Sequence, residues 1–277
     1  MKASSRPGLV IPALALALAS AALASVSGCR GLAEAGEPVG TLQPPEVTEF
    51  LGAVPPTAFL FRDWNVEGFP EYIFEIDGSL MVGIPATDGG TPFLIDKFEI
   101  TNSQYRTFCS ATSRIMPKHP TNPAWRHYYF LPKPSHPIDH VAWFDAHDYA
   151  IWSGKALPTA AEWTLAAMGK EPPPWMDGPP GLAVANTREV GHRAPDRAGS
   201  YPADVSSYGV YDMAGNVDEW AADAGYGSGR RVMGGNWGST REELERLVSM
   251  GSTDDAHEPQ HGFRTIFRLT PIRARGE

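Results

Sequence analysis

The residues best suited to bind a metal lie between positions 208 and 223, in the sequence YGVYDMAGNVDEWAAD. The dipeptide Gly215-Asn216 is typical of a tight turn, which would bring Asp212 back toward Glu219. Two carboxylates joined by a turn with free carbonyl groups offer the oxygen ligands that Ca²⁺ prefers. The spacing does not match a twelve-residue EF-hand loop. The stretch therefore predicts either a calcium site or a hairpin whose acidic side chains are solvated.

Histidines are the second group of candidate ligands, and the chain has eight of them. His257 and His261 are four residues apart, a spacing that would place both on one face of a helix as metal ligands. Pro259 between them argues against a helix, so a polar surface loop is the competing interpretation. His140 and His147 are seven residues apart, which corresponds to two helical turns. The sequence has no P-loop and no G-x-S-x-G elbow, two patterns that would indicate other chemistries.

The N-terminus resembles an export signal. Lys2 and Arg6 precede an apolar run from 9 to 23, and Val-Ser-Gly-Cys then ends at Cys29. This tetrapeptide resembles a bacterial lipobox, which implies a lipid anchor on Cys29 and a location in the bacterial cell envelope. Because Arg30 rather than Asp follows, the resemblance to enterobacterial sorting favours the outer membrane. The alternative is an ordinary signal peptide followed by a chance cysteine.

Composition narrows the class of protein. The net charge of −9 argues against a general nucleic-acid binder. The 28 glycines and 26 prolines, with few long periodic apolar runs, favour a loop-rich α+β fold. Only two cysteines are present, so a lipidated Cys29 leaves Cys109 without a disulfide partner. Cys109 shares helical spacing with Tyr105 and Phe108, and we expect a buried thiol there.

The chain divides into segments of different character. Residues 1–28 are predicted to be a signal peptide, 29–65 a lipid-anchored Pro-rich linker, 66–272 the folded domain and 273–277 a tail. Strands are expected in YIFEI, SLMVGI and PFLIDKFEI, in a short segment RRVM, and in GFRTIFRLT near the C-terminus. Helices are expected after Thr101 as N-cap, from Trp143 to Gly154, and after Thr159 with Glu162 at the capping-box spacing.

Five of these segments, in this order, resemble the formylglycine-generating enzyme (sulfatase-modifying factor) family. They are FLIDKFEITNSQYRTF, HPIDHVAWFDAHDYAIWSGKALPTAAEW, YGVYDMAGNVDEW, RVMGGNWGS and GFRTIFRL. The family also contains ergothioneine-synthase-like and pyoverdine-maturation-like proteins. The resemblance runs from about Tyr72 to Thr270. It implies an irregular, loop-rich α+β fold of the C-type-lectin-like kind, commonly stiffened by calcium.

The resemblance also implies particular site residues. The family's best calcium site corresponds to the Asp212 side chain, the Gly215 and Val217 carbonyls, and Glu219. A second site would use the Asn186 side chain with the Thr187 carbonyl.

For this second site the later acid has no clear counterpart, and Asp196 is the candidate.

Enzymes of the family hold copper with two cysteines shortly after an RGGS-like turn. The matching segment here has no cysteine, and Asp218 replaces a tryptophan of the family pattern. Soft Cu(I) prefers thiolate ligands, so no copper is expected and formylglycine generation is disfavoured.

Two functional hypotheses follow. The first is a non-catalytic, calcium-stabilised binding or scaffold protein, anchored in the envelope, whose partner is an envelope protein or a glycan. The second is a metal-dependent oxidoreductase of the same family that holds nonheme iron or copper with histidine and carboxylate ligands.

Overall fold

The computed structural model describes residues 44–87, 89–117, 133–169, 184–225, 229–245 and 250–272. All of them belong to one compact unit, Thr41–Glu277. The predicted signal peptide, Cys29, the first part of the predicted linker and the C-terminal tail lie outside the described residues. Within the described ranges, no helix is long and apolar enough to span a membrane.

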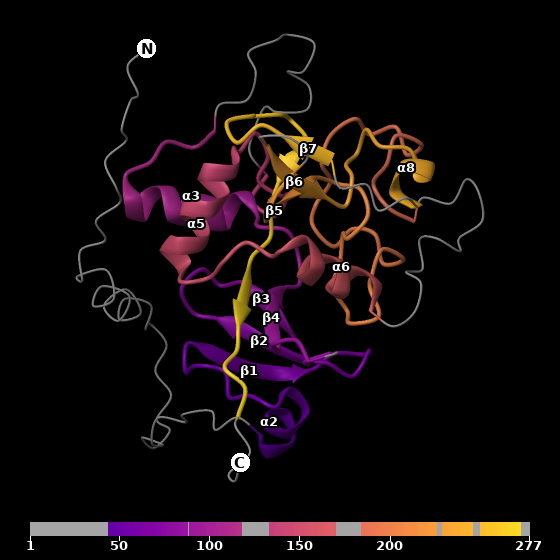
Figure 1. The fold of residues 1–277 in the computed structure, drawn as a ribbon. Coiled ribbons are helices and arrows are strands. Elements are labelled where there is room, and N and C mark those ends of the chain that lie inside the picture. The colour runs from indigo at the N-terminus through magenta and orange to yellow at the C-terminus, as the bar shows by residue number, and fades with distance from the viewer. Residues whose placement is uncertain are drawn as a thin grey trace, which may run out of the picture. The chain divides into compact units, whose positions relative to one another are not determined.

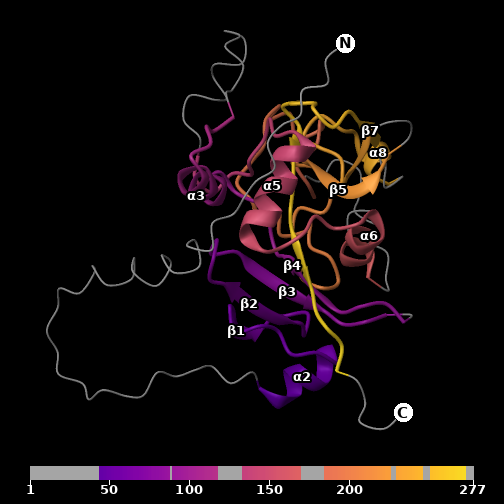
Figure 2. The same ribbon diagram turned by 60° about the vertical axis from the view of Figure 1, so that its left-hand side comes forward.

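A five-stranded antiparallel sheet forms one end of this unit, with strand order β1-β2-β3-β4-β9 (Figures 1 and 2). Its strands are β1 (Phe59–Trp64), β2 (Pro70–Phe74), β3 (Leu80–Ile84), β4 (Phe93–Asp96) and β9 (Ile266–Arg268). The three strands expected between residues 72 and 100 are confirmed as β2, β3 and β4. The C-terminal strand is shorter than the predicted GFRTIFRLT segment.

Residues 45–64 differ from the prediction of a linker. They form helix α2 (Pro45–Leu51) and strand β1, and α2 buries Val47 and Leu51 in the core beside the sheet. The Pro44-Pro45 pair, interpreted as linker, instead places a proline in the first turn of α2, where a missing N–H removes no helical hydrogen bond. The folded part therefore begins about twenty residues before the predicted boundary at residue 66.

Three helices follow β4 and agree with their capping signals. They are α3 (Asn102–Thr112), α5 (Trp143–Ser153) and α6 (Ala160–Met168). Thr101 and Gln104 form a capping box at α3, and Thr159 and Glu162 form one at α6. Gly154 ends α5 in the left-handed conformation, with φ 75°.

A second sheet has strand order β7-β6-β5-β8 and lies at the other end of the unit (Figures 1 and 2). It consists of β5 (Asp218–Ala224), β6 (Arg230–Met233), β7 (Met250–Ser252) and β8 (His261–Gly262). The short helix α8 (Arg241–Glu245) follows β6. Strand β8 runs parallel to β5, and the other pairs are antiparallel. The chain thus passes from β8 in this sheet to β9 in the first, and so ties the two together.

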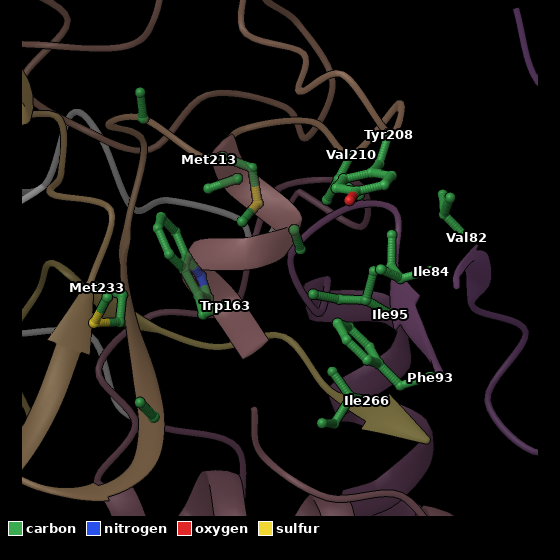
Figure 3. Close-up of a cluster of buried hydrophobic side chains, with 14 of the residues drawn as sticks. Val82, Ile84, Phe93, Ile95, Trp163, Tyr208, Val210, Met213, Met233 and Ile266 are labelled. Carbon is green, nitrogen blue, oxygen red and sulfur yellow. The ribbon is translucent and has the colours of Figure 1, made fainter. Parts of the chain in front are cut away.

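One core joins the two sheets. Trp163 of α6 lies among Met213, Met233 and apolar side chains of β3, β4 and β9, such as Ile95 and Ile266 (Figure 3). A second core holds Cys109 of α3, as expected, packed among aromatic residues of α3, α5 and β5. The observed fold is the predicted mixed α+β arrangement with irregular sheets.

Candidate functional site

The turn at Gly215-Asn216 adopts the conformation that its residues predict. Gly215 and Asn216 both have positive φ values, 79° and 58°. A side chain on Gly215 would place its Cβ 2.3 Å from the Asn186 carbonyl oxygen, so only glycine fits. The Asn216 N–H donates to that same carbonyl at 2.9 Å, and Asn186 Nδ2 donates to Asn216 Oδ1 at 2.9 Å. The two predicted calcium segments therefore lie against each other.

Glu219 is fully buried and engaged by protein donors. Its carboxylate accepts from Arg264 Nη2 and Nε, both at 2.6 Å, and from Trp163 Nε1 at 2.7 Å. This is a bidentate pair in a dry environment, where charge-assisted hydrogen bonds are strong. A cation using Glu219 would have to share it with Arg264. The structure thus places Glu219 in the same region as Asp212 but gives its charge a partner within the chain.

Asp212 lies within a larger group of buried acids around Arg264. Glu99, Asp204, Asp212 and Glu219 are each at most 2% exposed. Burial raises the pKa of Asp212 to about 6 and raises the pKa values of Glu99 and Asp204 well above their ordinary values. Four carboxyl groups therefore face one guanidinium. Such a group stays buried only with protons on some carboxyls or with an additional cation.

Two oxygens in this region lack donors among the residues that the structure describes. Asp204 Oδ1 and Asn186 Oδ1 have no hydrogen-bond partner within the described residues, and both residues are fully buried. Asp212 Oδ2 accepts from the Gly199 N–H at 2.6 Å. Among the described ranges, no group of three His, Cys, Asp or Glu side chains is arranged to hold a metal ion. A cation here would therefore need backbone carbonyl ligands, such as the carbonyls of Gly215, Val217 and Thr187 that the sequence analysis names.

Asp196, the candidate acid of the second predicted site, faces histidines. Its carboxylate lies 3.6 Å from His192 Nδ1 and 3.9 Å from His136 Nε2. Its own N–H donates to Asn216 Oδ1 at 2.8 Å. The structure therefore brings the Asp196 backbone to the turn and directs its side chain toward imidazoles.

His257 and His261 do not form a ligand pair on a helix. His261 is buried at the start of β8, with its ring 4.7 Å from that of Trp220 and its Nε2 4.0 Å from Asp218 Oδ2. His257 is exposed and places its Nε2 3.2 Å from Asp145 Oδ2. Residues 257–261 spell His-Glu-Pro-Gln-His, which has the letters of the H-E-x-x-H zinc pattern. Pro259 and the non-helical backbone remove the geometry that this pattern requires.

A hollow of about 600 Å³ lies beside these histidines. It is lined by Tyr105, Ile115, Pro117, His140, Asp145, His257 and Pro259. His140 precedes α5 and has a positive φ of 55°, so it does not share a helix with His147. His147 instead stacks on Trp143, with ring centroids 4.7 Å apart. His140 and His147 therefore do not lie two turns apart on one helix, although their spacing in the sequence would allow it.

The segment that would carry the copper cysteines contains Asn236, which hydrogen-bonds to a buried acid. Asn236 Nδ2 donates to Asp218 Oδ2 at 2.7 Å, and burial raises the pKa of Asp218 to about 7. Cys109 lies in the core on α3, and burial raises the pKa of its thiol. A raised thiol pKa disfavours the thiolate, which is the metal-binding form.

Sequence reasoning missed Glu99, Asp204 and Arg264 as parts of this region. The available signal was a charged residue inside an apolar strand pattern, such as Glu99 in PFLIDKFEI and Arg264 in GFRTIFRL. Charged residues are rarely buried unless they are paired.

Comparisons with known proteins agree with the family resemblance and the fold. The model of the sulfatase-modifying factor enzyme 1-like domain matches residues 85–269. A formylglycine-generating enzyme from Thermomonospora curvata is 31% identical over 234 residues, which cover 65% of this chain and 73% of that protein. An "Inactive C-alpha-formylglycine-generating enzyme 2" from Bos taurus is 31% identical over 150 residues, which cover 46% of this chain and 49% of that protein. The structure of PvdO from Pseudomonas aeruginosa superposes with a TM-score of 0.58 at 23% identity, over 70% of this chain and 95% of that one.

Proposed function

Since the chain belongs to the family of sulfatase-modifying factor enzyme 1-like domains, we propose that it is a non-catalytic binding or scaffold protein of the bacterial cell envelope. One observation carries this proposal: the chain has two cysteines, Cys29 and Cys109, and neither lies in the segment after the Gly234-Gly235 turn. A Cu(I) centre of the family kind needs two thiolates there. Cys109 is packed in a core, and burial raises the pKa of its thiol, which disfavours the metal-binding thiolate form.

The bovine relative supports the non-catalytic part of the proposal, because its name describes that protein as inactive. The lipobox-like sequence at Cys29 supports the envelope part. In this proposal Cys29 carries lipid, the outer membrane holds the anchor, and the folded domain presents its loops to an envelope protein or a glycan. Loops held on a rigid frame are a common arrangement for recognition.

Calcium has a structural role in the proposal. The Asp212 carboxylate and the carbonyls of Gly215 and Val217 would hold one ion, with Asn186 and Thr187 available for a second. The donor types fit, because Asn186 Oδ1 and Asp204 Oδ1 lack partners among the described residues and the acids outnumber the single arginine. Glu219 fits less well, because Arg264 occupies both of its oxygens. The ion would offset carboxylate charge and fix the turn.

Metal content tests the non-catalytic proposal. The full chain, purified without a metal-affinity tag or chelator, is analysed for metals by mass spectrometry, with a formylglycine-generating enzyme purified in parallel as the copper control. We expect calcium and no stoichiometric copper or iron. Copper or iron near one atom per chain would contradict the proposal and favour the oxidoreductase alternative. The first variants would then be His140→Ala and His257→Ala, at the two histidines that share the hollow of about 600 Å³.

Membrane fractionation tests the anchor. Cys29→Ser should move the protein from the membrane fraction to the soluble fraction, because the lipidated residue is lost. Cys109→Ser is the matched control, since it also removes one thiol, and it should stay with membranes. Retention of the Cys29→Ser protein in membranes would refute the lipid anchor.

A further inference from the structure

A second, smaller hollow lies where the chain leaves β4. Its volume is about 380 Å³, and its lining comes from three segments of the chain. The lining residues are Lys97, Phe98, Arg197, Ala198, Gly199, Ser200 and Tyr211. No residue of this hollow belongs to the predicted calcium ligands or to the histidine group.

Backbone hydrogen bonds fix these three segments in place. The Tyr211 N–H donates to the Lys97 carbonyl at 2.9 Å, and the Ala198 N–H donates to the Ser135 carbonyl at 3.0 Å. Gly199 has φ 73°, and a Cβ there would lie 2.6 Å from the Phe98 ring. Only glycine allows this approach of the loop to the ring. The hollow is therefore formed in advance, and a ligand would not have to order it.

Two cations, Lys97 and Arg197, line this hollow. Lys97 pairs with Glu71, and Arg62 pairs with the same carboxylate at 3.4 Å, so one acid serves two cations. Arg197 is exposed, and its guanidinium has no ion pair within the ranges that the structure describes. The nearby carboxylate of Asp212 is held by the Gly199 N–H at 2.6 Å. Arg197 is thus the cation available to a ligand, on a chain whose net charge is −9.

Two aromatic rings stand beside that cation. The rings of Phe98 and Tyr211 are 5.4 Å apart at an angle of 42°, and both side chains are partly exposed. The Lys97 ammonium lies 5.4 Å from the centre of the Tyr211 ring. Ser200 is exposed and adds a hydroxyl group. This combination offers an apolar surface for a ring and a guanidinium for an anionic group attached to it.

We propose that this hollow binds a ring-containing acidic ligand, with a carboxylate or phosphate group on Arg197 and its ring against Phe98 and Tyr211. An acidic sugar of the envelope has this chemistry. The inference rests on the proposed function as a binding protein, and it adds where a ligand binds and which class it belongs to. No covalent step is involved.

Nuclear magnetic resonance titration of the full chain in detergent tests the site. The probes are glucuronate, which carries a carboxylate on a sugar ring, glucose 6-phosphate, which carries a phosphate, and glucose as the neutral comparison. We expect one of the acidic probes to bind saturably and glucose to bind at least about tenfold more weakly, as expected for losing a charge-assisted hydrogen bond. Which acidic probe binds identifies the anionic group.

Two arginine variants assign the binding to the hollow. Arg197→Gln should weaken the acidic probe by about tenfold or more. Arg106→Gln removes the same charge from an exposed position on α3, outside the hollow, and should leave binding unchanged. Thermal unfolding of both variants at the wild-type temperature would show that the fold is intact.

Three results would overturn the proposal: no saturable binding of either acidic probe at millimolar concentration, equal binding of glucose, or the same loss in both arginine variants. These outcomes are separate from the metal analysis. Stoichiometric copper or iron would contradict the non-catalytic function while leaving Arg197-dependent binding intact. Absent binding would refute this hollow while leaving the metal result unchanged.

Discussion

Two buried charge clusters in the same unit differ in how completely they are balanced. The first is centred on Lys155, whose Nζ lies 2.7 Å from Asp77 Oδ2 and 3.0 Å from Asp96 Oδ1. The remaining oxygens are also engaged. Asp77 Oδ1 accepts from the Ser79 N–H at 3.0 Å, and Asp96 Oδ2 accepts from the Thr265 N–H at 2.7 Å. Every carboxylate oxygen of this Lys155 cluster has a donor.

The second cluster is centred on Arg264 and contains Glu99, Asp204, Asp212 and Glu219. Only Glu219 receives the guanidinium on both oxygens. Glu99 accepts from a single amide, Asn216 Nδ2, at 3.1 and 2.9 Å. Asp204 Oδ1 has no donor among the described residues. This Arg264 cluster thus has more acid than the donors among the described residues satisfy.

The Lys155 cluster is a structural ion pair, whereas the Arg264 cluster keeps a carboxylate oxygen without a donor among the described residues. Burial would raise the pKa of Asp77, but the charge and hydrogen bonds of Lys155 and Ser79 lower it overall. In the Arg264 cluster, burial and mutual repulsion of the acids raise the pKa values of Asp204 and Glu99. Within the Lys155 cluster, burial and the charge of Asp77 raise the pKa of Asp96. The contrast therefore holds between Asp77 and Asp204, which should respond in opposite ways to protons and to amide substitution.

Removing the Lys155 charge should have the largest effect. Lys155→Met leaves Asp77 and Asp96 buried without a cation, and we expect a loss of about 3–5 kcal/mol in the free energy of unfolding. Urea denaturation monitored by tryptophan fluorescence measures it. Lys133→Met, at an exposed position, is the control and should change stability by less than about 0.5 kcal/mol. A loss below about 1 kcal/mol for Lys155→Met would show that the cluster is not balanced as described.

Calcium should act on the Arg264 cluster alone. An ion that binds only the folded state at one hundred times its dissociation constant stabilises it by about 2.7 kcal/mol. We expect thermal unfolding at higher temperature in calcium than in EDTA, and loss of that difference in Asp212→Asn. Asp63→Asn, at an exposed position, is the matched control and should keep the full calcium response. An equal response in Asp212→Asn and wild type would place the ion elsewhere.

The elements that the sequence predicted are those with local signals. Helices α3 and α6 carry capping boxes at Thr101 and Thr159, which depend on residues three apart. Strands β2 to β4 alternate with turn residues such as Asp77 and Gly78. Helix α2 was missed because its prolines suggested a linker. Its apolar residues, Val47 and Leu51, pack against sheet residues that follow later in the chain, so the local sequence alone does not identify them as core residues.

The site was predicted only in part, for a related reason. Asp212, Glu219 and the Gly215 turn follow from a sixteen-residue stretch, and the structure places them in one region. The partners that decide their chemistry are distant: Arg264 lies 45 residues after Glu219, and Asn216 lies 117 residues after Glu99. A sequence pattern shows that an acid needs a partner, but the tertiary fold decides whether that partner is an arginine, a proton or an ion.

Amide substitution should change the free energy of unfolding in opposite directions at Asp204 and at Asp77. Asp204 has a raised pKa, so the folded state holds a proton that the unfolded state loses above about pH 4. Its contribution to stability therefore falls as pH rises. In EDTA, Asp204→Asn should raise the free energy of unfolding at pH 7.5 by about 1–2 kcal/mol, and by less near pH 4.

Asp77 has a lowered pKa, so its contribution is present above the unfolded value of 3.8 and is lost as pH falls through the folded value. Asp77→Asn should lower the free energy of unfolding at pH 7.5 by about 1–3 kcal/mol, with a smaller effect in acid. Urea denaturation from about pH 2 to pH 8 measures both variants. The same sign for both at pH 7.5 would end the distinction between the clusters.

Breaking an exposed ion pair should have the smallest effect on stability, and it serves as a reference for the three preceding predictions. Arg268 contacts both oxygens of Glu162 at 2.6 Å, but its side chain is 40% exposed, so water screens the pair. Glu162 also accepts from the Thr159 N–H and hydroxyl, both at 2.8 Å, so it keeps donors when Arg268 is removed. Arg268→Gln should therefore cost less than about 1 kcal/mol in urea denaturation. A cost near that of Lys155→Met would mean that burial does not explain the difference between ion pairs in this protein, and the contrast between the two clusters would lose its physical basis.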